Sequence, residues 1–134
     1  MSNKVLAYTL LRVFMGLNVF MHGAVRLGPN YRVFIEWVQG LYAETWLPTW
    51  LVTLEASIIP GWEMLVGILI LFGYKTRWGI ALGMVLMMSL VFGMTLIQDW
   101  ELVNRHIVYS LAFYLLLYNL DHNEVSLDAR LAKR

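Results

Sequence analysis

The 134-residue sequence contains no cysteine and little charge. Without cysteine it cannot form disulfides, thiolate zinc sites or iron–sulfur clusters, and thiol redox chemistry is excluded. Charged residues make up 14% of the chain and hydrophobic residues 60%, whereas soluble domains contain about 25% charged residues. So few charges would not keep a small domain in solution, and the composition therefore indicates a membrane protein. The net charge of +1 also gives no basic surface for nucleic acid.

Four long apolar segments divide the chain, at residues 5–27, 50–73, 78–97 and 102–120. Each has about 20 residues, which is enough to cross a hydrocarbon core of about 30 Å as a helix. In lipid the backbone polar groups must be satisfied within the segment, so helix is the expected structure. The sequence predicts an all-α fold: a bundle of four transmembrane helices, forming a single domain over residues 1–134 with a tail at 121–134.

The segment between the first two apolar stretches has its own pattern. Apolar residues recur there at helical spacing with polar residues between them, namely Val33, Phe34, Trp37, Val38 and Leu41. This pattern is typical of an amphipathic helix lying in the membrane interface. We expect a short interfacial helix over residues 31–46, which either caps the outer mouth of the bundle or simply anchors the loop.

The basic residues predict the orientation. Of the ten lysines and arginines, six lie at the N-terminus, between the second and third segments, or in the tail: Lys4, Lys75, Arg77, Arg130, Lys133 and Arg134. Cytoplasmic loops carry an excess of Lys and Arg. Both termini are therefore predicted to be cytoplasmic, with loops 28–49 and 98–101 facing outward.

Several polar side chains lie inside the apolar segments, where a central charge costs roughly 2.5–3.5 kcal/mol. His22, Glu55 and His106 each lie four or five residues from the outer end of their helix, about 6–8 Å below the boundary. We predict that they face the bundle interior and share one layer. There they would be the catalytic groups of a site that binds quinone or handles protons.

Further residues are expected around this layer. Arg26 and Arg105 lie just above it, where they would stabilise negative charge on a reduced quinone. Three residues follow along the last helix and would line the entrance for the quinone tail, namely Tyr109, Ser110 and Tyr114. No metal site is predicted.

Two charges, Arg12 and Glu63, are expected in a second, deeper layer. A buried charge requires a partner, because an unpaired one is strongly destabilising. The sequence therefore predicts a structural ion pair between Arg12 and Glu63.

Five short segments resemble the DoxX family of small bacterial membrane proteins. They are Leu11–Gly16, Phe20–Leu27, Trp62–Gly67, Gly73–Arg77 and Val125–Asp128. The resemblance implies a four-helix bundle in the bacterial inner membrane. It also implies a link to quinone chemistry, because related small proteins include subunits of a thiosulfate:quinone oxidoreductase.

These observations leave three functions open. The first is a membrane subunit of a quinone-linked respiratory oxidoreductase, whose electron donor must come from other membrane or periplasmic subunits, because the chain has no flavin or haem-attachment motif. The second is a non-catalytic accessory or assembly subunit of a larger membrane complex. The third is a b-type cytochrome in which His22 and His106 bind haem. The lipid bilayer is a partner in all three, and nucleic acid in none.

Overall fold

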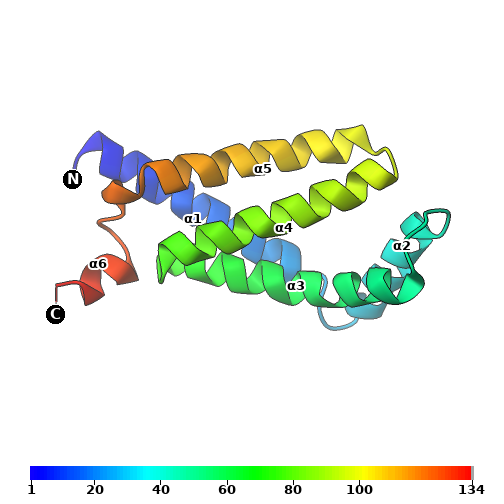
Figure 1. Cartoon of the computed structure of the whole chain (residues 1–134). Helices are drawn as coiled ribbons and strands as arrows, with labels where there is room; N and C mark the ends of the chain where they lie inside the picture. Colours follow the sequence, from blue (N-terminus) through cyan, green and yellow to red (C-terminus); the bar gives the residue numbers. More distant parts are fainter. Residues whose placement is uncertain (134) are drawn as a thin grey trace.

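The computed structural model describes residues 1–133, and they form an all-helical fold (Figure 1). The elements are α1 (Asn3–Ala24), α2 (Asn30–Tyr42), α3 (Thr49–Phe72), α4 (Thr76–Leu96), α5 (Trp100–Tyr118), the short 3-10 helix η1 (Leu120–His122) and α6 (Leu127–Leu131). Both termini lie at one end of the molecule and α2 at the other, and we call these the termini end and the α2 end. Arg134, which contributed to the predicted orientation, lies outside the described residues.

Three helices, α1, α3 and α4, are long and apolar enough to cross a membrane. They contain 22, 24 and 21 residues, or about 32 to 36 Å of helix, so the protein is a multi-pass membrane protein. The fourth predicted span corresponds to α5, which has 19 residues but is not among these three helices. Its first turns carry Glu101, Asn104 and Arg105, which lower its hydropathy.

Glycines allow α1 and α3 to approach until their backbones touch. A Cβ atom on Gly16 would lie 2.4 Å from the backbone nitrogen of Leu71, and one on Gly67 would lie 2.4 Å from that of Phe20. A larger residue at either glycine would push the helices apart. These two helices accordingly form the most extensive helix–helix interface of the molecule.

The same contacts fix the register of α3 along α1. Gly16 faces Leu71, whereas Gly23, near the end of α1, faces Pro60. The first turns of α3, residues 49–59, therefore extend beyond the end of α1. The depths predicted from the sequence placed the outer ends of these two helices level, which is wrong by about ten residues, or about 15 Å.

Helix α2 packs on the part of α3 that extends beyond α1. The Tyr31 hydroxyl donates to the Ser57 carbonyl at 2.9 Å, and the Gln39 amide donates to the Thr53 hydroxyl at 2.7 Å. Val38 of α2 is buried in a small core together with the α3 residues Val52 and Ala56. A helix is therefore present in the predicted segment, but it ends at Tyr42 and not at residue 46, and its apolar face packs on α3.

Arg12 is buried at the termini end, and its partners are backbone carbonyls. Its Nη1 donates to the carbonyls of Ile70 and Leu71 at 2.7 and 2.6 Å, and its Nη2 donates to that of Val125 at 2.8 Å. The last carbonyls of a helix have no intrahelical partner and carry partial negative charge. The C-terminal turn of α3 thus stabilises Arg12, and the predicted ion pair with Glu63 does not form.

Asp128 caps the start of α4 from the tail. Its carboxylate accepts from the backbone N–H groups of Lys75 and Thr76, at 2.7 and 2.8 Å, and from the Thr76 hydroxyl at 2.7 Å. Acidic groups at a helix N-terminus are stabilising because they meet unpaired N–H groups and the positive end of the helix dipole. Gly73, which ends α3 at a φ of 64°, leaves no room for a side chain, because its Cβ would lie 2.5 Å from that of Ser126.

We expect Asp128→Ala to lower the melting temperature of the purified protein, since it removes the cap of α4. Loss of such a cap costs about 1–2 kcal/mol. The measurement is thermal unfolding in detergent followed by tryptophan fluorescence. Asp121→Ala is the matched control, because Asp121 is exposed on η1. Equal melting temperatures for the two variants would contradict the capping role.

Candidate functional site

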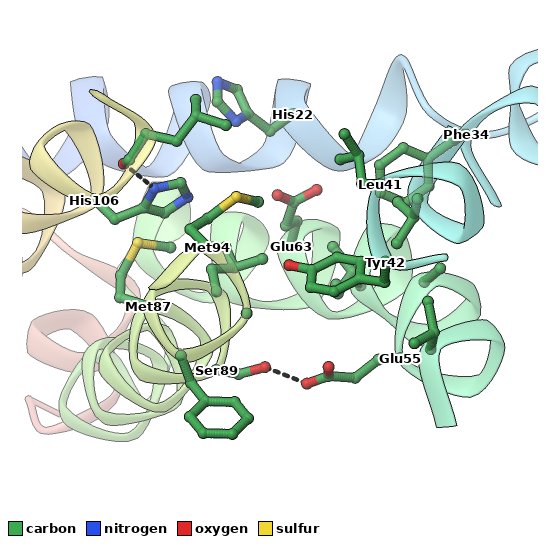
Figure 2. A pocket seen from close by; sticks show the side chains of 18 of the residues that line it. His22, Phe34, Leu41, Tyr42, Glu55, Glu63, Met87, Ser89, Met94 and His106 are labelled. Carbon is green, nitrogen blue, oxygen red and sulfur yellow. Dashed lines mark hydrogen bonds between the residues drawn. The ribbon is translucent and has the colours of Figure 1, made fainter. Parts of the chain in front are cut away.

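A cavity of about 580 Å³ lies toward the α2 end of the bundle, and all five long helices contribute to its wall. We call it the central cavity. Most of its lining is apolar, with Phe34 and Leu41 from α2, Ile59 from α3, and Met87 and Met94 from α4. Figure 2 shows the two histidines in one part of the cavity, Glu55 with Ser89 in another, and the Glu63 carboxylate between them. Cavities of this size and composition are typical of small-molecule sites.

Two histidines occupy one side of the central cavity, His22 on α1 and His106 on α5 (Figure 2). Both rings lie near Tyr109, with centroid distances of 6.0 Å from His22 and 6.5 Å from His106. The Tyr109 hydroxyl donates to the Asn18 side-chain oxygen at 3.0 Å, which joins α5 to α1. The structure thus brings together His22 and His106, two of the three residues that the sequence analysis expected in one layer.

The tautomer of His106 follows from its surroundings. Its Nδ1 lies 2.6 Å from the Leu102 carbonyl oxygen. A carbonyl can only accept, so Nδ1 carries the proton, and in the neutral ring Nε2 keeps a free lone pair. His106 is thereby prepared to accept a hydrogen bond or a proton through Nε2.

Glu55 lies on the other side of the central cavity, where its Oε1 accepts from the Ser89 hydroxyl of α4 (Figure 2). Tyr42 closes this side from α2, and its hydroxyl lies against Gly93, where a Cβ atom would be only 2.4 Å away. Burial, and to a lesser degree the Glu55 carboxylate, raise the pKa of Tyr42. The phenol is therefore neutral. Among residues 1–133, Glu55 has no basic side chain as a hydrogen-bond partner.

Glu63 forms an ion pair with Arg26, which follows the end of α1. Arg26 Nη1 lies 2.6 Å from both carboxylate oxygens. The Glu63 side chain is only 4% exposed and that of Arg26 is 30% exposed, and the guanidinium also lies 4.7 Å from the centre of the Phe34 ring. Arg26 thus replaces the predicted partner Arg12, because the register of α3 brings Glu63 to the end of α1.

The other predicted residues divide into two groups. Tyr109 and Arg105 line the central cavity, although Arg105 is exposed and paired with Glu101 at 2.5 Å. Ser110 and Tyr114 lie outside it. Ser110 donates to the His106 carbonyl at 2.9 Å, and Tyr114 stacks on Tyr118 with ring centroids 5.7 Å apart.

Sequence reasoning did not identify Ser89 or Tyr42 as part of the site. In the sequence, Ser89 is a small residue in a long apolar segment, and Tyr42 is one of several aromatic residues between the first two apolar segments. A hydroxyl that donates a hydrogen bond to a carboxylate on another helix produces no recognisable pattern in the sequence around it. Only the packing of α2, α3 and α4 around one space brings these residues to Glu55.

One comparison with known proteins identifies a family. The family model described as methylamine utilisation protein MauE matches residues 4–107, from α1 into the second turn of α5. The chain belongs to the MauE family. The match includes Glu55, Glu63 and both histidines of the central cavity. No curated protein and no solved structure matches the chain.

Membership of the MauE family corrects the resemblance to DoxX, which is wrong. Several residues of the segments behind that resemblance have packing or capping roles in the structure. Gly16, Gly23 and Gly67 allow close helix contact, and Asp128 caps α4. Residues with such roles report how helices pack and carry no information about a ligand.

We expect Arg26→Met to destabilise this MauE-family protein more than Glu63→Gln does. Arg26→Met leaves a buried carboxylate unpaired, which costs roughly 3–5 kcal/mol, whereas Glu63→Gln leaves a guanidinium that reaches solvent. The double variant Arg26→Met/Glu63→Gln should recover most of the loss. The measurement is the melting temperature in detergent, and a double variant no more stable than Arg26→Met would contradict the pairing.

Proposed function

We propose that this chain is a membrane accessory protein that binds the ring of a quinone or quinol in the central cavity. The observation that carries the proposal is the arrangement of that cavity, with apolar walls and polar groups on two opposite sides. A quinone ring is flat and apolar, with one oxygen at each end. It therefore needs apolar contact on its faces and a polar partner at each end.

The residues of the two sides have distinct roles in this proposal. His106 receives one ligand oxygen through Nε2, and His22 stands beside it. Glu55, held by Ser89, receives the other. Arg26 and Glu63 stabilise the wall between them as a charge-neutral pair.

A quinone site requires an electron donor that this chain does not provide. It contains no cysteine, and its sequence has no flavin fingerprint or haem-attachment motif. We therefore propose that other membrane or periplasmic subunits supply the electrons. The description of the MauE family concerns methylamine utilisation, so the expected partner is an enzyme that oxidises a small amine.

A purely structural accessory role is the second candidate. It is favoured by the outer turns of α5, where Asn104 and Arg105 are exposed beside the exposed apolar residues Ile107 and Val108. Polar groups on a membrane-facing surface are costly unless they meet a partner. In this role α5 would dock another subunit, and the central cavity would hold no quinone.

We further propose that α5 is a fourth span and that both termini are cytoplasmic, in a bacterial inner membrane. Helix α5 packs along α4 and contributes to the central cavity. Its exposed residues include Ile107, Val108, Leu111 and Leu115, which suit lipid. The basic residues near the termini and in the α3–α4 turn support this orientation.

Single cysteines test this topology, since the natural chain has none. We expect a membrane-impermeant maleimide to label Glu44→Cys in cells whose outer membrane is permeable to it. Lys4→Cys and Glu124→Cys should react only after lysis. With only three spans the termini would lie on opposite sides, so different labelling of Lys4→Cys and Glu124→Cys would contradict the proposal.

We expect His22→Ala and His106→Ala each to weaken binding of a short-chain ubiquinol roughly tenfold, the upper range for loss of one hydrogen bond. His122→Ala is the matched control, because the third histidine lies on η1 outside the central cavity. Binding is measured by quenching of tryptophan fluorescence in lipid nanodiscs, and circular dichroism verifies folding. If neither the oxidised nor the reduced ubiquinone binds the wild-type protein, the quinone role is wrong.

A further inference from the structure

We propose that the central cavity selects a ligand with two hydroxyl groups, the quinol, over the corresponding dicarbonyl, the quinone. This inference rests on the proposed function, in which a ring of this class occupies the cavity. It follows from which hydrogen-bonding atoms of the wall are already used within the protein and which remain free.

Three hydrogen-bond donors of the wall are used internally. The Tyr109 hydroxyl donates to Asn18 and the Ser89 hydroxyl to Glu55. His106 donates through Nδ1 to the Leu102 carbonyl at 2.6 Å. A hydroxyl or a neutral imidazole has only one polar hydrogen. None of these groups can therefore donate to a ligand while its internal bond persists.

The atoms left free on the two sides are acceptors. His106 retains the lone pair of Nε2, because its proton is on Nδ1. Glu55 uses Oε1 for Ser89, and its Oε2 has no hydrogen-bond partner in the part of the chain that the structure describes. An ionised carboxylate accepts about four hydrogen bonds and donates none. These two acceptors lie on opposite sides of the central cavity (Figure 2).

Some polar groups of the wall can still donate, namely the indole N–H of Trp37 and the N–H groups of Arg26 and Arg105 that their ion pairs do not use. His22 can adopt either tautomer, and the Tyr42 hydroxyl both donates and accepts, so each suits either ligand form. Arg26 is paired with Glu63, and Arg105 with Glu101. His106 Nε2 and Glu55 Oε2 can each accept a hydrogen bond from a ligand hydroxyl, whereas a carbonyl oxygen cannot donate one.

A quinol satisfies both free acceptors, and its bond to Glu55 is charge-assisted. A quinone places a carbonyl oxygen against a carboxylate, which leaves both acceptors unpaired and adds repulsion. An unsatisfied buried polar group is destabilising, and a site built to bind a hydroxyl discriminates strongly against an analogue that lacks it. We therefore expect the quinol to bind at least tenfold more tightly than the quinone.

The experiment titrates the wild-type protein in lipid nanodiscs with one short-chain ubiquinone, first oxidised in air and then reduced under anaerobic conditions. The expected result is a Kd for the quinol at least about tenfold below that for the quinone. For a two-electron couple this ratio raises the midpoint potential of the bound ligand by about 30 mV. Equal affinities, or tighter binding of the quinone, would overturn the inference and leave the proposed function intact.

Glu55→Gln tests the acceptor directly, because it replaces one of the two carboxylate oxygens with an N–H₂ donor. Its preference for quinol over quinone should fall about tenfold through loss of the charge-assisted bond. Glu36→Gln, the same change at an exposed position of α2, should keep the wild-type ratio. A ratio in Glu55→Gln equal to that of the wild type would overturn the inference.

Ser89→Ala provides an independent test should Glu55→Gln fold poorly. Removing the Ser89 hydroxyl frees Oε1 of Glu55 and adds an acceptor to the cavity. The preference for quinol should therefore persist or increase. A preference that reverses in favour of quinone in Ser89→Ala would show that the hydroxyl, and not the carboxylate, recognises the ligand, and it would overturn the inference.

Discussion

The close approach of α1 and α3 is the contact on which the other features of the structure depend. Gly16 and Gly67 place the two backbones in contact, and this fixes the register of the helices. The register leaves residues 49–59 of α3 beyond the end of α1, where α2 packs on them. The central cavity forms where α2 and this part of α3 meet α4 and α5. A shift of α3 by one turn would separate Glu63 from Arg26 and remove Glu55 from Ser89.

The intramembrane charges are compensated in two different ways. Arg12 is surrounded by backbone carbonyls and needs no carboxylate, because the C-terminal end of α3 supplies partial negative charge. Glu63 has a formal counter-charge in Arg26. Within the described part of the chain, Glu55 has neither kind of partner and accepts a hydrogen bond from the Ser89 hydroxyl alone. This difference separates Arg12 and Glu63, whose charges are compensated within the fold, from Glu55.

The sequence predicted the helices well and their relative positions poorly. Hydropathy and periodicity located every long helix, including α2. Both signals report which residues along one helix are apolar, and this is enough to recognise a helix. They contain no information on how far one helix slides along another. Arg12 and Arg26 lie 14 residues apart, only about 40° around α1, so either could have met Glu63. The proximity of His22 and His106 could be predicted, because His22 lies near the C-terminal end of α1 and His106 near the N-terminal end of α5. The Glu55–Ser89 contact was not, since it depends on the register of α3.

The cap on α4 also fixes the order in which the protein is completed. Thr76 begins α4, but the carboxylate that satisfies its N–H group belongs to Asp128, 52 residues later in the chain. On the ribosome, α4 and α5 therefore emerge before the turn between α3 and α4 has its partner. The same stretch delivers Val125 to Arg12, so that one late segment completes both the cap of α4 and the coordination of Arg12. This segment is thus synthesised after the helices that form the cavity.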